Sequence, residues 1–269
     1  MTDILKRSLA PITDAAWEEI DDTARQTLRP LLSARKIVDF EGPKGWEFAA
    51  LNAGRLTLPK KPPAKGVGWG VRKVLPLVEA RMQFTLSLWE LDNISRGAAD
   101  PDLEPLEEAA IELALFEENT IYNGLKDAGI DGILPAASQK AIKLPAKAED
   151  YPRAVAQGID VLQADGIGGP YALVLGPAAY LTLTQAVGPG YPVKRGVESL
   201  LNGPICRSRA LEGGVLLSIR GGDFEMTVGA DLSIGYSSHT SEEVNLFLTE
   251  SFTFRVLEPG AAVELKQGK

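Results

Sequence analysis

Residues 51–84 read "LNAGRLTLPKKPPAKGVGWGVRKVLPLVEARMQF", and this stretch decides the fold. Its two ends alternate apolar and polar residues over short runs, which is typical of half-buried β-strands. Between the ends, the lysines, prolines and glycines of residues 60–70 offer a hydrophobic core almost nothing to bury. Clusters of glycine and proline mark turns and loops. The stretch therefore predicts a long hairpin or an extended loop that projects from the rest of the chain.

The remainder of the chain has ample material for a core. Apolar residues make up 45% of the 269 positions and charged residues 24%, as in ordinary soluble globular proteins. No run of about 18 apolar residues predicts a transmembrane helix, and the N-terminal residues lack the apolar centre of a signal peptide. The net charge of -8 argues against a nucleic-acid-binding protein. The single cysteine, Cys206, rules out an internal disulfide framework and favours a reducing cytoplasm.

Candidate catalytic and metal sites are few, because the chain has one histidine, His239. A Ser-His-Asp triad or a histidine-rich metal site would depend on that residue alone. Its surroundings, "GYSSHTSEE", indicate a polar turn between two strands, so we interpret it as a solvated loop residue. The segment "GIGGPY", residues 166–171, lacks the spacing of a dinucleotide fingerprint and precedes a strand, which favours a turn. We predict neither a catalytic site nor a metal site.

Two long helices are predicted. Residues 13–32 place apolar side chains three or four positions apart, with Thr13 or Asp14 as N-cap and Pro30 kinking or ending the helix late. Residues 103–128 form the second, with Pro105 in the first turn and Gly129 after the last. Five of its glutamates, at positions 107, 108, 112, 117 and 118, invite comparison with a ferritin-like iron site. That site needs Glu-x-x-His pairs, so a solvated glutamate face is the better interpretation.

The other segments predict an α+β fold. Short strands are expected at residues 36–40 and 45–51, and a long strand-like stretch at 71–93. Residues 130–223 alternate helices and strands, which favours a compact α/β module inserted within a larger domain. Its expected helices span residues 151–166, 177–187 and 191–201, and its expected strands span 169–177 and 213–222. Residues 224–236 and 244–265 alternate over long stretches, as long antiparallel strands do.

Seven stretches, in order along nearly the whole chain, resemble the linocin-like encapsulins. They are "LKRSLAPITDAAWEEID", "RKIVDFEGPKGWEFAA", "RKVLPLVEARMQFTLSLWELDN", "GPYALVL", "GYPVKRGVESLL", "RGGDFEMTVGADLSIGY" and "FLTESFTFRVLEPGAA". The ordered set is far more specific than any one piece. Encapsulins are shells of bacterial and archaeal nanocompartments, and they share the fold of the major capsid proteins of tailed phages. The resemblance implies a peripheral domain, an axial domain and an extended loop.

The resemblance also implies domain boundaries. The N-terminal helix and the start of the peripheral domain would occupy residues 1–50, and the extended loop residues 51–84. The peripheral domain would continue through the long spine helix in residues 85–133, the axial domain would be residues 134–222, and residues 223–269 would return to the peripheral domain. In this family the extended loop reaches neighbouring subunits. Its apolar residues would lose contact with water only on assembly, and they are Leu56, Leu58, Val67, Trp69 and Val71. The alternative, a disordered surface loop, is disfavoured by Trp69 and by the flanking strand patterns.

Three sites follow from the resemblance alone. A cargo peptide would dock beside the N-terminal helix on residues Leu28, Leu31, Leu32, Leu232, Ile234 and Tyr236, each of which is an equally good core residue. The turn Gly188, Pro189, Gly190 and Tyr191 matches a pore-lining loop at the five-fold axis, or else it is an ordinary surface turn. Arg81, Trp89 and Tyr191 match a position with which flavin has been associated, although Trp89 can equally be a packing residue. We expect no bound cofactor.

The implied function is structural. The chain would be a non-enzymatic subunit of an icosahedral shell of sixty copies or a multiple of sixty. The shell would enclose a peroxidase or a ferritin-like protein that carries a short C-terminal targeting peptide. A viral major capsid protein is the first alternative, disfavoured by the acidic charge. A peptidase or bacteriocin is the second, and it lacks any supporting constellation of catalytic residues. Neither a nucleic acid nor a membrane is expected as a partner.

Overall fold

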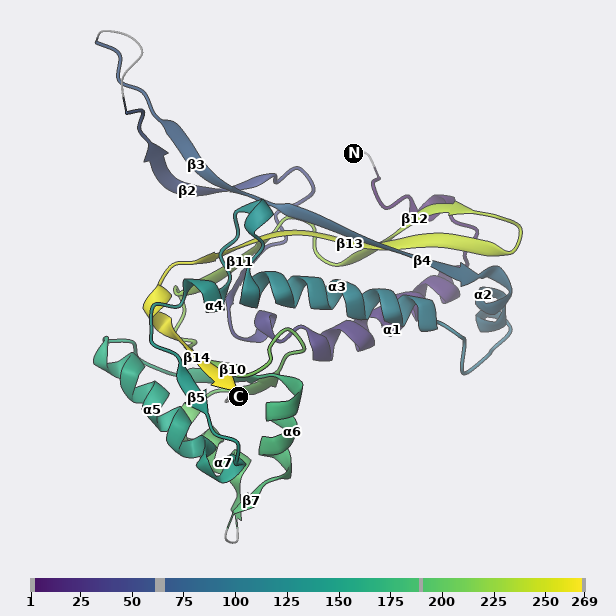
Figure 1. Cartoon of the computed structure of the whole chain (residues 1–269). Helices are drawn as coiled ribbons and strands as arrows, with labels where there is room; N and C mark the ends of the chain where they lie inside the picture. Colours follow the sequence, from purple (N-terminus) through teal and green to yellow (C-terminus); the bar gives the residue numbers. More distant parts are fainter. Residues whose placement is uncertain (1–2, 61–65, 189–190, 268–269) are drawn as a thin grey trace.

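A computed structural model describes residues 3–60, 66–188 and 191–267 and shows two domains and a projecting arm (Figure 1). The helices are α1 (Asp14–Leu31), α2 (Leu88–Ser95), α3 (Glu104–Asn123), α4 (Ile133–Ala136), α5 (Tyr151–Ala164), α6 (Pro177–Gln185) and α7 (Val193–Leu201). The first strands are β1 (Asp39–Glu41), β2 (Ala50–Thr57), β3 (Val71–Pro76), β4 (Val78–Ser87), β5 (Ile142–Leu144), β6 (Tyr171–Leu175) and β7 (Val187–Gly188). The others are β8 (Tyr191–Pro192), β9 (Ile205–Arg207), β10 (Gly214–Ser218), β11 (Phe224–Val228), β12 (Ser233–His239), β13 (Glu243–Val256) and β14 (Ala262–Gln267).

The elongated first domain is a sheet covered by two long helices. Its strands run in the order β1-β11-β13-β12, and the long strand β13 also pairs with β4. Helix α3 packs on β4 and β13, and α1 packs on α3. Thr13 begins α1 as predicted, since its hydroxyl accepts a hydrogen bond from the amide of Ala16 at 3.3 Å. One face of α1 is buried, through Trp17, Ile20, Ala24 and Leu28.

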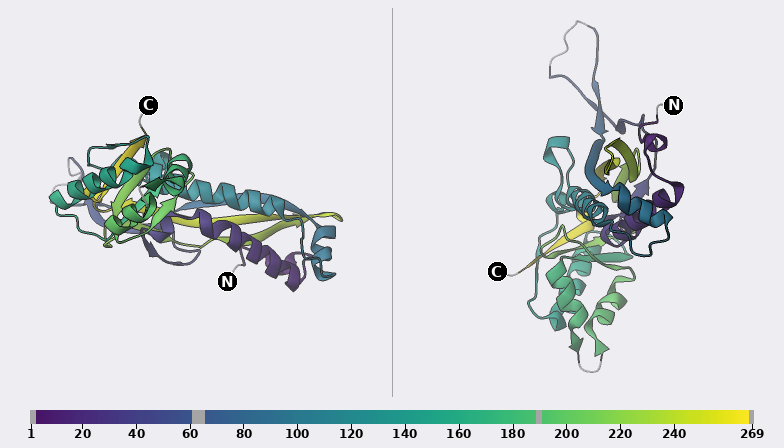
Figure 2. Two further views of the ribbon diagram at one scale, coloured as in Figure 1. Left: turned by 90° about the horizontal axis from the view of Figure 1, so that it is seen from below. Right: turned by 90° about the vertical axis from the view of Figure 1, so that its right-hand side faces the viewer.

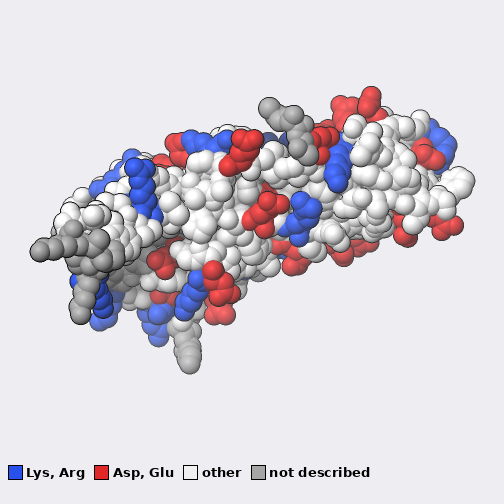
Figure 3. Space-filling view, turned by 90° about the horizontal axis from the view of Figure 1, so that it is seen from above, with Lys and Arg blue, Asp and Glu red and all other residues white. Residues whose placement is uncertain are grey.

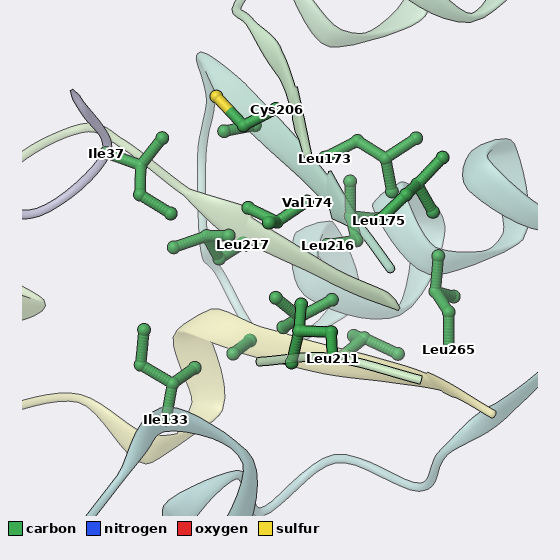
Figure 4. Close-up of a cluster of buried hydrophobic side chains, with 14 of the residues drawn as sticks. Ile37, Ile133, Leu173, Val174, Leu175, Cys206, Leu211, Leu216, Leu217 and Leu265 are labelled. Carbon is green, nitrogen blue, oxygen red and sulfur yellow. The ribbon is translucent and has the colours of Figure 1, made fainter. Parts of the chain in front are cut away.

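The second domain surrounds a five-stranded sheet in the order β5-β14-β10-β6-β9. Strands β6 and β10 are antiparallel neighbours, and every residue of both is buried. Their runs "YALVL" and "GVLLS" are nearly continuous in apolar residues, as expected for strands covered on both faces. Figure 4 shows Leu173, Leu175, Leu216 and Leu217 in this core with Leu265 beside them. Helices α5, α6 and α7 belong to the same domain (Figure 2).

The C-terminal strand departs from the predicted division of the chain. We assigned residues 223–269 to the first domain, but β14 lies between β5 and β10 in the sheet of the second. Its apolar residues Ala262, Val263 and Leu265 are buried there. The chain crosses between the domains through a short 3-10 turn, Pro259–Ala261. Alternation in the sequence shows that a strand forms, but not which sheet it joins.

Three local predictions were also wrong. The spine helix α3 ends at Asn123 and not at residue 128, because Gly124 takes a φ of +84° and packs against the backbone of Gly132. Residues 88–95 form helix α2 and do not continue the strand. Residues 45–49 form a turn before β2, and no separate strand is present there.

The arm is the antiparallel pair β2–β3, which extends away from both domains (Figures 1 and 2). The predicted tip residues Lys61, Pro62 and Pro63 lie outside the described residues. On the face shown in Figure 3, acidic and basic side chains are interspersed over a largely uncharged surface. None of the described helices is long and apolar enough to cross a membrane. Nor do the described residues contain a group of three or more metal-binding side chains.

Candidate functional site

A groove of about 480 Å³ runs between helix α1 and the start of strand β12. Helix α1 contributes Ala24 and Leu28, and Leu32 follows directly after it. The opposite wall is the segment Leu232–Ile234. Four of the six residues predicted to bind a cargo peptide therefore meet here, namely Leu28, Leu32, Leu232 and Ile234. Leu28, Leu32 and Ile234 are also core residues, so they support the groove from below, while Leu232 is only partly buried.

The two other predicted residues do not line this groove. Leu31 faces a different pocket of about 310 Å³, between α1, α3 and the second domain. Leu31 comes three positions after Leu28, a spacing at which helical residues can share a face, so the packing of α3 and the second domain around Leu31, and not the helix periodicity, separates the two. The hydroxyl of Tyr236 lies 2.6 Å from Nδ1 of His239, near the tip of the β12–β13 hairpin. The main-chain amide of Tyr236 donates to the carbonyl of Leu5, which joins the N-terminal segment to the edge of β12.

A buried cluster of charged residues closes one end of the groove. Arg35, in the 3-10 turn Ala34–Lys36, contacts three carboxylates from three parts of the chain. It donates to Glu117 of α3 at 2.6 Å, to Asp231 at 2.8 Å and to Glu250 of β13 at 3.1 Å. The side chains of Glu117 and Glu250 are fully buried, whereas that of Asp231 is 41% exposed. Arg35 and Asp231 both line the groove.

The cluster has one cationic side chain, that of Arg35, for three carboxylates. Burial raises the pKa of Glu250 well above its usual range, and the neighbouring charge of Glu117 raises it further. The guanidinium of Arg35 opposes this rise but does not cancel it. The other carboxylate oxygen of Glu250 is buried without a hydrogen-bond partner among the described residues. Burial acts against the positive charge of Arg35, yet its contacts with Glu117, Glu250 and Asp231 raise its pKa overall.

Glu118 forms a second buried network beside the first. Its carboxylate accepts hydrogen bonds from the hydroxyls of Ser33 and Ser208 at 2.5 and 2.6 Å, and from the amide of Ala34 at 2.8 Å. Burial raises the pKa of Glu118, and these hydrogen bonds partly oppose that rise. Ser208 belongs to the second domain, so Glu118 joins the two domains. The predicted solvated glutamate face of α3 is therefore wrong at residues 117 and 118.

The sequence contained a signal for this cluster that our prediction missed. In β13, the side chain of Glu250 points to the same face as those of Leu246, Leu248, Phe252 and Phe254, because these positions are an even number of residues apart. All four apolar residues are buried. Glu117 follows Leu113 by four residues and therefore lies on the apolar face of α3. A carboxylate on a predicted core face requires a partner, and Arg35 is that partner.

The arm presents apolar side chains to solvent. Its five predicted contact residues are exposed, with Leu56 at 57%, Leu58 at 70%, Val67 at 57%, Trp69 at 45% and Val71 at 59%. Val74, which we did not select, is 52% exposed. Strands β2 and β3 pair only with each other in the described chain, so each has a free edge. The free edge of an apolar strand can form backbone hydrogen bonds with a strand of another chain.

The proposed pore turn is described only in part. The paired strands β7 and β8 contain the backbone of Gly188 and Tyr191. Pro189 and Gly190 lie outside the described residues, as do the side chains of Gly188 and Tyr191. The hairpin is at the tip of the second domain, far from β4 and α2 (Figure 1). One chain therefore does not bring Tyr191 together with Arg81 and Trp89. Arg81 instead lies over the ring of Phe247, at 4.1 Å, and Trp89 is exposed in α2.

A two-domain chain with a long spine helix and an exposed strand arm has the architecture of a capsid-type fold. Solved structures agree on the fold. A virus-like particle from Pyrococcus furiosus superposes with a TM-score of 0.67 at 15% identity, covering 93% of this chain and 99% of that one. The capsid of Myoviridae phage XM1 gives a TM-score of 0.58 at 14% identity, with coverage of 88% and 92%.

Sequence comparison identifies the family. Residues 1–253 match the family model described as "Encapsulating protein for peroxidase". A type 1 encapsulin shell protein of Rhodospirillum rubrum is 45% identical over 97% of this chain and 96% of its own length. Those of Rhodococcus erythropolis and Mycobacterium tuberculosis are 40% and 39% identical, each over 97% of this chain and 98% of their own length. The chain belongs to the encapsulin shell family and is a structural protein, as predicted.

Proposed function

We propose that this chain closes into an icosahedral shell of sixty copies, or a multiple of sixty, that retains an enzyme through the groove between α1 and β12. The observation that carries the proposal is the convergence of Leu28, Leu32, Leu232 and Ile234 on a groove beside the N-terminal helix. The resemblance to encapsulins implies docking of a cargo peptide at this place. The enclosed enzyme would be a peroxidase or a ferritin-like protein, and the shell would be cytoplasmic.

The groove suits a short extended peptide with apolar side chains. About 480 Å³ accommodates a few side chains and not a folded domain. Its apolar floor belongs to the core of the first domain, so the binding surface is preformed. A preformed surface reduces the ordering cost of binding to that of the peptide alone.

Assembly through the arm supplies the closed wall. Each arm offers exposed apolar side chains and free strand edges, while the first domain offers Trp89 of helix α2, which is 68% exposed. Contact of one surface with a different surface of the next copy is heterologous, and such contacts close when the rotation permits. The formal charge of -8 per copy makes a shell strongly acidic, so buried apolar area must outweigh charge repulsion.

A retention assay tests the proposal. The chain is produced together with a fluorescent protein that carries the C-terminal peptide of a peroxidase or ferritin-like protein from the same genome. Negative-stain microscopy should show closed particles of uniform size, and fluorescence should co-elute with them. Leu232→Asp should abolish co-elution and leave the particles intact, because Leu232 is only partly buried at the rim. Leu257→Asp, at an exposed leucine that does not line the groove, is the matched control. Particles that retain the probe equally well in both variants would refute the groove.

A further inference from the structure

We propose that Arg35 is a positioning residue that holds the groove wall, residues 230–234, in place. It does so only while Glu117 and Glu250 share one proton. An effect of this wall on peptide binding rests on the proposed function. The position of the wall itself rests only on contacts within the chain.

The cluster contains more negative than positive groups. Three carboxylates surround a single guanidinium, and two of them are fully buried. The charged groups that face Glu250 are Glu117 from α3, Arg35 from the 3-10 turn and Asp231 from the β11–β12 connection. On β4, the residue opposite Glu250 is Ala80, which carries no charge. Two ionised carboxylates cannot easily share one buried site with one cation, so one of the pair holds a proton.

The hydrogen bonds of the two glutamates indicate where the proton is held. Glu117 uses both oxygens to accept from Arg35, at 2.6 to 3.0 Å. Glu250 has only one contact with Arg35, at 3.1 Å, and its other oxygen has no partner among the described residues. Glu117 and Glu250 both accept from the same nitrogen of Arg35, Nη2, at 2.6 and 3.1 Å, so their carboxylates lie beside each other. A proton on Glu250 donated to Glu117 would satisfy a buried atom that is otherwise unpaired.

Asp231 links the protonated pair to the groove wall. Asp231 accepts from Arg35 at 2.8 Å and, through the same oxygen, from the amide of Leu232 at 2.8 Å. Arg35 therefore holds the strand segment that begins the groove wall. Loss of the shared proton leaves two buried negative charges that compete with Asp231 for the guanidinium. Asp231 is partly exposed and can exchange Arg35 for water, so it is the contact that gives way.

The expected behaviour follows from the sign of this competition. Below the pH at which the proton is lost, the wall segment 230–234 is fixed. Above that pH, Arg35 shifts toward the glutamates and the segment loosens. Glu250→Gln replaces the protonated carboxyl by a neutral group of the same shape that donates to Glu117, so its wall should stay fixed at every pH.

Hydrogen–deuterium exchange of assembled shells tests the inference without any cargo. Wild type and Glu250→Gln are compared at each pH from about 5 to about 9, so that the intrinsic pH dependence of exchange cancels. At alkaline pH, segment 230–234 should exchange about tenfold faster in wild type than in the variant, and equally fast at acidic pH. Glu225→Gln, at a paired carboxylate of the same sheet, should follow wild type. Equal exchange in wild type and Glu250→Gln throughout would overturn the inference.

Two further measurements keep the outcomes separate. Infrared spectra should contain a protonated carboxyl band at neutral pH that disappears in Glu250→Gln, and absence of that band in wild type would contradict the shared proton. Arg35→Lys should loosen the wall at all pH values, because a lysine ammonium cannot bridge three carboxylates as the guanidinium fork does. If the wall responds to pH while a peptide-tagged fluorescent protein is retained equally well, the inference stands and the proposed docking site fails.

Discussion

The arm and the core of the second domain use similar residues in opposite ways. Val174, Leu175 and Leu216 are fully buried between neighbouring strands of one sheet. In the arm, Leu56 and Leu58 are more than half exposed, although Leu56 lies within an antiparallel strand pair and Leu58 follows directly after it. The difference lies in where the partners are. The core residues find them within the chain, whereas we propose that the arm residues find theirs on another copy.

Stability and assembly should therefore be separable. If the proposed role of the arm is correct, substitutions in the core change the stability of the subunit, and substitutions in the arm change assembly. Between these two extremes lie residues that are buried but incompletely paired, such as Glu250, and residues that are half-buried, such as Leu31.

The largest effect is expected in the core. Leu216→Ala removes a side chain with no exposed surface from the central strand β10. The transfer and cavity terms together should lower the free energy of unfolding by about 2–5 kcal/mol. Chemical denaturation of the subunit followed by circular dichroism measures this loss. A change below about 1 kcal/mol would mean that the sheet of the second domain is not the stabilising core.

The arm should give the opposite result. The double substitution Leu58→Ser and Trp69→Ser removes two exposed apolar side chains that contact little within their own chain. The free energy of unfolding of the subunit should change by less than about 0.5 kcal/mol, as at other exposed positions. Assembly should fail, so size-exclusion chromatography should give a small species in place of particles. Intact shells from this variant would mean that the arm is a surface loop without partners.

Glu250 lies between these two cases, because it is a core residue with one carboxylate oxygen that has no hydrogen-bond partner among the described residues. Its raised pKa means that wild-type stability is complete below the ordinary glutamate pKa and falls as pH rises through the raised value. Glu250→Gln should remove that slope. The stability difference between variant and wild type should be small in acid and grow in alkali, by about 1.4 kcal/mol for each unit by which the pKa is raised. Thermal unfolding at several pH values measures it, and parallel curves would contradict the shift.

These comparisons indicate how much the sequence could predict. Local patterns identified α1, the arm and the strands β6 and β10, because each depends on periodicity or turn chemistry within a short segment. The membership of β14 in the second sheet and the pairing of Arg35 with Glu117 and Glu250 depend on contacts between distant segments. Periodicity could have placed Glu250 on a core face, although our prediction did not use it, but periodicity could not have identified the partner of Glu250.

The candidate site shows the same limit. The resemblance placed Leu28 and Leu232 on one docking surface, and the structure brings both to one groove. The resemblance did not show that Leu31 and Leu28 face different pockets. That difference depends on which segments pack against each side of α1, and a sequence pattern does not reveal them. The flavin position stays a prediction, since within one chain the β7–β8 hairpin and α2 lie at distant ends of the molecule (Figure 1).

The smallest effect is expected at Leu31, and it tests the corrected outline of the groove. Leu31→Ser removes a half-buried side chain from the pocket between α1, α3 and the second domain, and should cost about 1 kcal/mol of stability. Retention of a peptide-tagged fluorescent protein should match wild type, whereas Leu232→Asp should abolish it. Leu31 is one helical turn from Leu28, so equal loss in both variants would mean that the peptide crosses the end of α1 into the second pocket. The groove would then be one half of a longer docking surface.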